Sequence, residues 1–448
     1  MNLKEIHNVY FVGIGGIGMS ALARYFHATK KQVGGYDKTA TKLTDDLQSK
    51  GIDIHFEDDI DLIASNFKEK NNTLIVYTPA IPKDHKELNY FQDNGFVIMK
   101  RAEVLGLITE DSFCFAVAGT HGKTTTSSIL GHIMQPYNAT SFLGGISENY
   151  HSNLILGGDQ LTVVEADEFD RSFLKLSPNI ACITSTDADH LDIYGHHSEL
   201  EDSFQEFSDK VSGQVFVAKG VGVKGTSYAV EEEADYQIQN VAIKDGSYVF
   251  DVKTPEKYVD GIQFSLPGKH NLMNALAAFA MAESYGISTD SIKESLQSFR
   301  GVERRFSYKI KTDDLVLIDD YAHHPTEINA VYDAVQEMYP EEKNMVIFQP
   351  HLFSRTQDFA DDFASSLSQF DEVLLLDIYP ARELPIEGVN SEWLLTKINN
   401  GNKKITYRQD LVSEIKKSGA KIVAMLGAGD IGVMISEVTD QLNSIEKV

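Results

Sequence analysis

The chain has 448 residues, a length that favours two to four domains over one. Its 66 acidic residues outnumber its 40 basic residues, and no block of Lys or Arg offsets the net charge of −26, which argues against nucleic acid and anionic membranes as partners. The sequence shows no signal-peptide pattern and no apolar stretch approaching about 20 residues, so we expect a cytoplasmic protein without membrane insertion.

Short apolar runs alternate with helical patterns along the whole chain, which is typical of βαβ units and mostly parallel sheets. Boundaries near residues 107 and 300 predict three consecutive α/β domains, 1–106, 107–299 and 300–448. The two cysteines, Cys114 and Cys182, lie within apolar runs, so buried thiols are expected rather than a disulfide or a metal pair. The predicted strands, in chain order, cover residues 9–12, 32–36, 73–77, 113–117, 161–164, 180–184, 315–318, 345–348, 373–376 and 422–426, with a polar, β-rich stretch at 215–264 and an alanine-rich helix at 271–284.

A glycine motif opens the first predicted domain. Residues 13–18 read G-I-G-G-I-G directly after the strand 9–12, and Asp37 follows the next strand. Taken alone, this pattern predicts a dinucleotide site of the NAD type. The glycines provide only a tight turn and a helix N-terminus that faces a diphosphate, so the diphosphate of a uridine nucleotide fits equally well.

A second glycine motif opens the middle domain. Residues 118–126 read A-G-T-H-G-K-T-T-T and follow the apolar run 113–117. The glycines let backbone N–H groups approach phosphate oxygens, Lys123 can reach the β- and γ-phosphates, and the Thr124 hydroxyl is placed for Mg²⁺. The strict P-loop pattern requires glycine where this chain has Val117, so the motif is a shorter variant. The alternative interpretation of this motif is a glycine-rich turn beside a solvated lysine that binds no phosphate.

Acidic clusters follow two predicted strands of the middle domain, at residues 165–170 and 187–192. Carboxylates at the carboxyl ends of strands in a P-loop domain could neutralise Mg²⁺ that bridges the nucleotide and a reacting oxygen. His190 lies in the second cluster and is an unusual ligand for Mg²⁺, so Mn²⁺ or a structural role are the alternatives there. Three further segments, 268–274, 304–306 and 319–325, are not diagnostic by themselves.

Taken together and in this order, these motifs resemble the Mur ligases of peptidoglycan synthesis. The resemblance spans the whole chain. It is carried by residues 13–19, 78–81, 101–103, 119–126, 165–170, 189–190, 270–271, 305, 319–325, 349–351, 355 and 380–383. It implies a Rossmann-like amino-terminal domain that holds a UDP-sugar, a central P-loop ATPase-like domain, and a Rossmann-like carboxyl-terminal domain. The NAD interpretation of the first glycine motif then gives way to UDP.

The resemblance also implies a reaction. ATP phosphorylates the lactyl carboxylate of UDP-N-acetylmuramate, and the amino group of L-alanine attacks the acyl phosphate, a step in building the cell wall that sustains cell shape and division. Expected ATP contacts are Gly119, Thr120, His121, Gly122, Lys123, Thr124, Thr125, Asn271, Arg305 and Asp320. Expected UDP-substrate contacts are Gly15, Gly16, Ile17, Gly18, Met19, Asp37, Thr78, Ala80, Arg101, His351 and Arg355. The expected catalytic residues are Lys123, Glu165 and His190, and Mg²⁺ or Mn²⁺ is expected on Thr124, Glu165 and His190. Glu168 and Asp189 are candidates for the base that takes the proton from the amine.

One departure from the wider family indicates the branch. Sister ligases that add later amino acids use a carbamoylated lysine soon after the metal histidine, whereas residues 191–209 contain no lysine. This absence fits the branch that adds L-alanine. The alternatives are the ligase that recycles murein tripeptide onto UDP-N-acetylmuramate, a nicotinamide-dependent oxidoreductase built on the first glycine motif, and a regulatory ATPase that binds the UDP-sugar without ligation.

Overall fold

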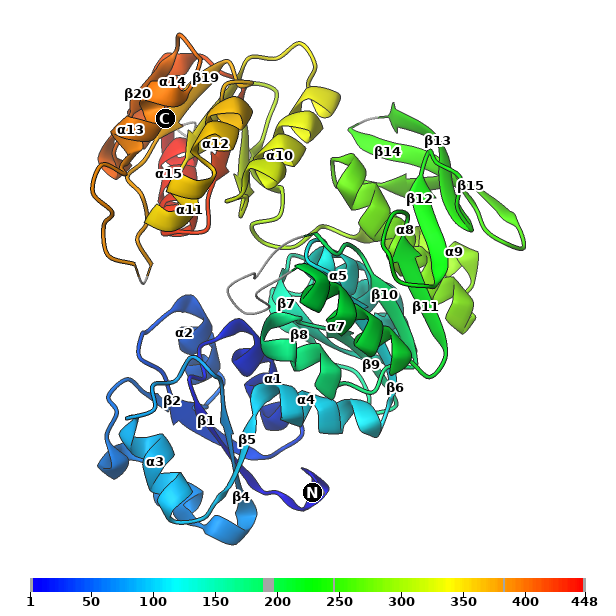
Figure 1. Cartoon of the computed structure of the whole chain (residues 1–448), viewed down its shortest axis with the longest axis vertical. Helices are drawn as coiled ribbons and strands as arrows, with labels where there is room; N and C mark the ends of the chain where they lie inside the picture. The colour runs from blue at the N-terminus through cyan, green and yellow to red at the C-terminus, as the bar shows by residue number, and fades with distance from the viewer. Residues whose placement is uncertain (1–2, 188–196, 245, 382, 446–448) are drawn as a thin grey trace. The chain divides into compact units, whose positions relative to one another are not determined.

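The computed structural model describes residues 3–187, 197–244, 246–381 and 383–445, and its strands form three sheets (Figure 1). The chain divides into two compact units. The first comprises Met1–Asn240, Phe250–Gln263 and Met273–Phe299, and the second comprises Val241–Val249, Phe264–Leu272 and Arg300–Val448. None of the helices in the described ranges is long and apolar enough to cross a membrane.

The amino-terminal sheet has five parallel strands in the order β3-β2-β1-β4-β5. Buried β1 lies at its centre, and the chain proceeds outward first to one side and then to the other, so the strand order reverses next to the loop that follows β1. This reversal is where open α/β sheets bind ligands. The elements are β1 (Asn8–Val12), α1 (Ile17–Ala28), β2 (Gln32–Tyr36), α2 (Lys42–Ser49), β3 (Asp53–His55), β4 (Thr73–Tyr77), α3 (Lys86–Asp93), β5 (Val97–Lys100) and α4 (Arg101–Glu110).

The second sheet has ten strands in the order β15-β14-β13-β12-β11-β10-β6-β9-β7-β8. Its β6 pairs in parallel with β10 on one side and β9 on the other, so three carboxyl ends meet at one edge. The elements are β6 (Phe113–Ala118), α5 (Lys123–Met134), β7 (Thr140–Ser147), β8 (Ser152–Ile155), β9 (Leu161–Glu165), β10 (Ile180–Ile183), α7 (His197–Asp209), β11 (Gln214–Ala218), β12 (Thr226–Val230), β13 (Tyr236–Lys244), β14 (Ser247–Lys253), β15 (Tyr258–Phe264), α8 (Lys269–Tyr285) and α9 (Thr289–Ser298).

The carboxyl-terminal sheet has six strands in the order β16-β17-β21-β18-β19-β20, and only β16 runs antiparallel to its neighbour. The elements are β16 (Ser307–Lys311), β17 (Val316–Asp320), α10 (Pro325–Met338), β18 (Asn344–Phe348), α11 (Phe353–Asp358), α12 (Ala360–Leu367), β19 (Glu372–Leu375), α13 (Ser391–Lys397), β20 (Lys403–Ile405), α14 (Leu411–Ser418), β21 (Ile422–Leu426) and α15 (Ile431–Ile445).

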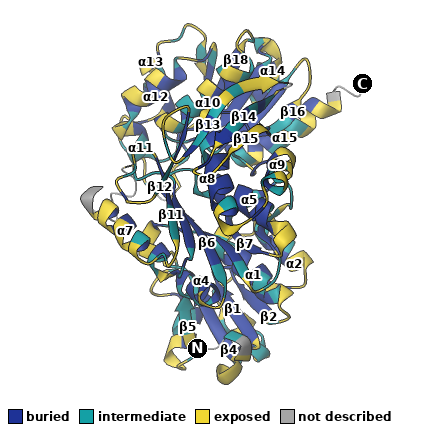
Figure 2. Ribbon diagram, turned by 90° about the vertical axis from the view of Figure 1, so that its right-hand side faces the viewer, coloured by how far each residue is buried: buried dark blue, intermediate teal, exposed yellow. Residues whose placement is uncertain are grey.

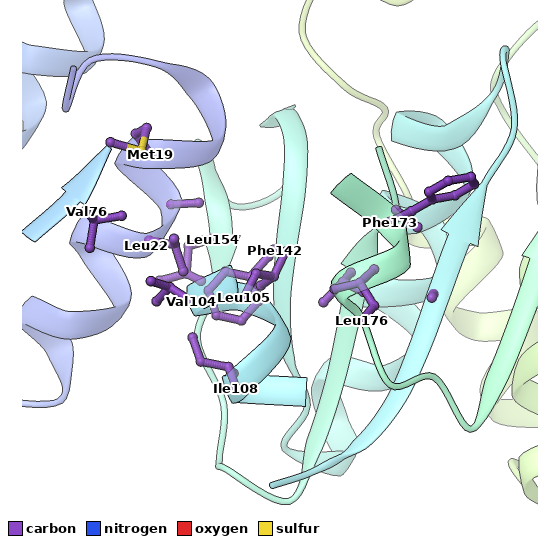
Figure 3. Packing of buried hydrophobic residues seen from close by; sticks show 14 of the residues in the cluster. Met19, Leu22, Val76, Val104, Leu105, Ile108, Phe142, Leu154, Phe173 and Leu176 are labelled. Atoms are coloured by element: carbon purple, nitrogen blue, oxygen red, sulfur yellow. The ribbon is translucent and has the colours of Figure 1, made fainter. Parts of the chain in front are cut away.

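Burial follows the sheets: β1, β6 and β21 are almost wholly buried. Exposed residues gather on helices and loops (Figure 2). Within the first unit, one hydrophobic cluster continues from the amino-terminal sheet into the middle sheet. Figure 3 shows Leu22 of α1 and Leu105 of α4 in this cluster beside Phe142 of β7 and Leu154 of β8. Burial of these apolar side chains holds the two glycine loops of the first unit on a common core.

All ten strands predicted from single apolar runs are present, and the β-rich stretch contains β11 to β15. The α/β fold class is therefore confirmed. The boundaries at residues 107 and 300 remain predictions. Both cysteines are buried and free, and burial raises the pKa of each thiol to about 12.

Candidate active site

The phosphate loop joins β6 to α5 and needs its two glycines for different contacts. Gly119 and Gly122 have φ of 129° and 79°, a region of backbone conformation that residues other than glycine rarely adopt. A Cβ on Gly119 would lie 2.2 Å from Oγ1 of Thr184, and one on Gly122 would lie 2.6 Å from Oδ1 of Asn274. The loop therefore packs so closely against the residue that follows β10 and against α8 that no side chain fits at either glycine.

Hydroxyl groups after β10 hold the loop in shape. The Ser185 hydroxyl accepts a hydrogen bond from the His121 backbone N–H at 2.8 Å and lies 2.9 Å from the Thr120 hydroxyl. The Thr126 hydroxyl donates to Oδ1 of Asn274 at 3.1 Å, which ties the buried first turns of α5 to α8. Thr125 is buried in the same turns. Both Ser185 and Asn274 thus support the loop. Ser185 was not singled out from the sequence, and Asn274 belongs to the segment 268–274, which was not diagnostic by itself.

Lys123 begins α5 and points back over the loop. Its ammonium group donates to the Gly119 carbonyl at 2.5 Å, lies 3.4 Å from the Thr120 carbonyl, and forms an ion pair of 2.8 Å with the Glu168 carboxylate. The Lys123 side chain is 14% exposed and that of Glu168 is fully buried. Glu168, considered above only as a candidate base, is therefore the carboxylate partner of the phosphate-loop lysine.

Thr124 and Glu165 bring two oxygen donors together at the end of β9. The Thr124 hydroxyl donates to Oε1 of Glu165 at 3.1 Å, and Oε2 accepts the Gly144 backbone N–H at 2.9 Å. Burial raises the pKa of Glu165, and the Lys123 charge opposes this shift. A Cβ on Gly144 would lie 2.3 Å from the Glu165 carboxylate oxygens, so glycine leaves the room that this carboxylate occupies. A hydroxyl beside a carboxylate fits a hard divalent cation, which prefers oxygen ligands.

The first glycine loop lies between β1 and α1 and is closed by Asp37. The Asp37 carboxylate accepts the Gly15 backbone N–H at 2.7 Å and the Thr39 backbone N–H at 3.1 Å. On the other side, buried Asn153 of β8 donates to the Ile17 carbonyl at 2.5 Å and to the Ser20 hydroxyl at 2.9 Å. The start of α1 is therefore held from both the amino-terminal and the middle sheet.

The first unit contains a cavity of about 330 Å³. It is lined by residues of the first glycine loop and by Glu165, whose carboxylate contacts Thr124 beside the phosphate loop. Of the residues expected to contact the UDP-substrate, Gly16, Ile17, Gly18, Met19, Thr78, Ala80 and Arg101 line it, and so does Glu165. Asp167 of the acidic cluster 165–170 also lines it, and so do Phe142 and Gly144, which were not assigned from the sequence. Arg101 donates to Oδ2 of Asp167 at 3.2 Å, so this cation is already paired with a carboxylate at the cavity wall.

Other predicted site residues lie in the second unit or outside the described residues. His190 and Asp189 fall in the undescribed range 188–196, so their roles stay predictions. Asn271, in the first turn of α8, donates through Nδ2 to the Pro267 carbonyl at 2.7 Å. The Arg305 guanidinium lies 5.4 Å from the centre of the Tyr321 ring.

Asp320, at the end of β17, accepts two backbone hydrogen bonds. The Phe306 N–H donates to one carboxylate oxygen at 2.6 Å, and the Ala322 N–H donates to the other at 2.7 Å. Burial raises the Asp320 pKa to about 6, although the Arg305 charge opposes the shift. The side chain therefore shapes the loop around it, whatever ligand it also contacts.

His351 and Arg355 lie around the start of α11. The His351 ring stacks on Tyr379 with ring centres 5.7 Å apart, and burial lowers its pKa to about 4, with the charges of His323 and Arg355 acting in the same direction. His351 is therefore a neutral imidazole at neutral pH. Its predicted contact with the UDP-substrate, and that of Arg355, stay predictions.

Comparison with known proteins identifies the family. Family models match residues 8–112 (Mur ligase family, catalytic domain), 117–282 (Mur ligase middle domain) and 304–436 (Mur ligase, glutamate ligase domain). The UDP-N-acetylmuramate–L-alanine ligase of Flavobacterium johnsoniae is 60% identical over 447 residues, covering 99% of each chain. The chain belongs to the Mur ligase family.

Three further proteins are similar to the chain, two of them alanine ligases and one a relative in fold alone. The enzyme of the same name from Flavobacterium psychrophilum is 59% identical and covers 99% of this chain and all of its own length. The crystal structure of UDP-N-acetylmuramate–alanine ligase from Thermotoga maritima superposes with a TM-score of 0.84 at 28% identity, covering 98% of this chain and 99% of that one. A murein peptide ligase from Psychrobacter arcticus shares the Mur ligase fold with a TM-score of 0.67 at 20% identity.

Proposed function

We propose that the chain is an ATP-dependent ligase that joins L-alanine to the lactyl carboxylate of UDP-N-acetylmuramate through an acyl phosphate. One observation carries this proposal: a single cavity is lined by the first glycine loop and by Glu165, which lies against Thr124 of the phosphate loop. A UDP-sugar held by the glycine loop would extend toward the place where a nucleotide's phosphates are expected. The two Flavobacterium relatives named UDP-N-acetylmuramate–L-alanine ligase, at about 60% identity over the whole length, support the choice of substrates.

The residues have chemistry suited to each step. The backbone N–H groups of the phosphate loop would bind the triphosphate, and the Lys123 charge would stabilise the transferring phosphoryl group. The start of α1 would receive the UDP diphosphate, with Arg101 available for an anionic group in the cavity. The Glu165 carboxylate and the Thr124 hydroxyl would hold Mg²⁺, with His190 proposed for a second ion. Such an ion neutralises phosphate charge and orients the reacting oxygens. Because the reaction consumes ATP, we place it in the cytoplasm.

The direct test is a product assay. The purified chain is incubated with UDP-N-acetylmuramate, ATP and Mg²⁺, and with either L-alanine, other single amino acids or the murein tripeptide. We expect ADP, phosphate and a product heavier by one alanine residue only with L-alanine. Efficient use of the tripeptide instead would assign the recycling reaction. Turnover of a nicotinamide cofactor, or ATP hydrolysis without any amide product, would contradict the proposal.

Substitution of the phosphate-loop lysine provides the first prediction. Lys123→Ala should lower kcat/KM by about 100-fold or more, because a charge directed at the transferring phosphoryl group contributes ~3 kcal/mol or more to the transition state. Lys219→Ala is the matched control, since Lys219 forms only a half-exposed ion pair of 3.6 Å with Glu232. The control should keep wild-type turnover. A Lys123→Ala enzyme with more than about one tenth of wild-type activity would refute the assignment of the phosphate loop.

A further inference from the structure

The three N–H donors of Lys123 all have acceptors within the protein. The ammonium group faces the carbonyls of Gly119 and Thr120 and the carboxylate of Glu168. A lysine ammonium has three donors and no acceptor, so a phosphate oxygen can bind it only by replacing one of these partners. The two carbonyls belong to the backbone of the loop itself. The Glu168 carboxylate is the partner that a phosphate also repels, because both are anions.

Glu168 is carried by a turn, residues 167–171, whose backbone is strained. Asp170 and Arg171 are consecutive and have φ of 54° and 52°, in the left-handed region that residues other than glycine enter at a cost. Strain of this kind persists only where surrounding contacts enforce it. The contacts around the turn include backbone hydrogen bonds, from the Arg171 N–H to the Glu168 carbonyl at 3.0 Å and from the Phe173 N–H to the Asp167 carbonyl at 2.9 Å. They also include ion pairs on both sides of Glu168: Arg101 with Asp167 at 3.2 Å and Lys100 with Asp170 at 3.0 Å.

The turn therefore connects two ligand-binding cations. At one end Arg101 and Asp167 both line the cavity, and the Arg101 guanidinium lies so close to Gly18 of the first glycine loop that a Cβ there would be 2.6 Å from it. In the middle of the turn, Glu168 holds Lys123 of the phosphate loop. An anion of the UDP-substrate that draws Arg101 away from Asp167 removes one of the contacts that hold the turn in its strained shape.

We propose that Glu168 is the counter-ion that the ATP triphosphate replaces on Lys123, and that the turn 167–171 couples this exchange to Arg101 in the cavity. Glu168 is thus a positioning residue for Lys123. The inference rests on the proposed function in taking UDP-N-acetylmuramate as the ligand of the cavity. Because coupling between two binding sites is reciprocal, each ligand should increase the affinity for the other.

The test measures binding without turnover. The affinity of the full-length protein for the non-hydrolysable ATP analogue AMP-PNP with Mg²⁺ is determined by calorimetry, with and without saturating UDP-N-acetylmuramate. In the wild type, UDP-N-acetylmuramate should lower the Kd of AMP-PNP by about fivefold or more. Glu168→Gln keeps an oxygen acceptor for Lys123 but removes the negative charge. It should bind AMP-PNP about tenfold more tightly than the wild type when UDP-N-acetylmuramate is absent, and the effect of UDP-N-acetylmuramate should shrink below about twofold.

A matched variant and a second substitution complete the design. Glu283→Gln also removes a largely buried carboxylate from a lysine pair, with Lys257 at 3.0 Å, and should leave both affinities unchanged. Lys100→Met releases only the half-exposed contact to Asp170, so it should fold even if Glu168→Gln does not, and it should reduce the coupling by at least about half.

Several results would overturn the inference: weaker AMP-PNP binding by Glu168→Gln, wild-type coupling in either variant of the turn, or independent binding of the two ligands to the wild type. Failure of UDP-N-acetylmuramate to bind the wild type would refute the proposed function instead. The two failures are therefore distinguishable.

Discussion

Asp320 and Asp37 show how a single carboxylate can serve the fold and a site at once. Each was predicted from the sequence to contact a nucleotide, and in the structure each accepts two backbone N–H groups. The first glycine motif predicts Asp37, because an acidic side chain at a fixed distance after such a motif is typical of nucleotide sites, whereas Asp320 is predicted only from the family resemblance. Both nucleotide contacts stay predictions. They could not predict the pairing of Glu168 with Lys123, because the geometry of the irregular turn between β9 and β10 is not encoded in any periodic pattern.

Burial of the Asp320 carboxyl makes a prediction about pH. Its pKa of about 6 in the folded protein lies above the ordinary value of 3.8. Between these values the folded state holds a proton that the unfolded state has released, so this group's contribution to stability is full below the lower value and is lost as pH rises through the upper one. The loss amounts to about 3 kcal/mol at most.

Trp393 is the only tryptophan and lies in the same unit as Asp320, so its fluorescence during urea unfolding measures the relevant stability. The stability advantage of the wild type over Asp320→Asn should be larger near about pH 4 than near about pH 7, since only the wild type loses the contribution. Asp361→Asn, on the exposed pair with Lys397, is the control and should keep the wild-type profile. A difference between wild type and Asp320→Asn that grows as pH rises would contradict the argument.

At the level of elements, the predictable strands are those with buried apolar runs, such as β1, β6 and β21. The strands that no single run predicted are β3, β5, β7, β8, β16 and β20. Most of these are short or partly exposed strands at or near sheet edges. An edge strand pairs on one side only and can be partly exposed to solvent, so its sequence need not form a continuous apolar run. β7 is mostly buried but contains Gly144 and Gly145, which weaken a strand pattern, and Gly144 makes room for the Glu165 carboxylate.

The close approach of β2 to β1 gives an element-level prediction. A Cβ on Gly35 would lie 2.3 Å from the Phe11 carbonyl oxygen, which is backbone and cannot turn aside. Gly35→Ala should therefore destabilise the first unit by about 1–3 kcal/mol and weaken UDP-N-acetylmuramate binding, because β1 leads directly into the first glycine loop. Gly222→Ala has no atom within 4 Å of its new Cβ and should change stability by less than about 0.5 kcal/mol. Urea unfolding of both variants checks this, and equal midpoints would disprove it.

At the scale of the whole molecule, the charge of −26 acts on every anionic substrate that approaches. The cations nearest the expected ligands do not reverse this field, because Lys100, Arg101 and Lys123 are paired with Asp170, Asp167 and Glu168. Long-range repulsion should therefore dominate the encounter, and short-range hydrogen bonds should dominate the bound state. The two contributions can be separated by salt, because screening weakens long-range interactions far more than contacts.

We therefore expect the association rate constant of UDP-N-acetylmuramate to rise with ionic strength. Between about 0.01 M and 0.15 M salt the screening length falls from about 30 Å to about 8 Å, so the rate constant should increase by roughly threefold or more. Stopped-flow measurements with a fluorescent UDP-sugar would follow association and dissociation separately, with uncharged uridine competition as the control for changes in the site itself. The dissociation rate should change little. An association rate that falls as salt is added would show that the paired cations still attract the substrate, and that the field at the cavity is set by Arg101 and Lys123 rather than by the net charge.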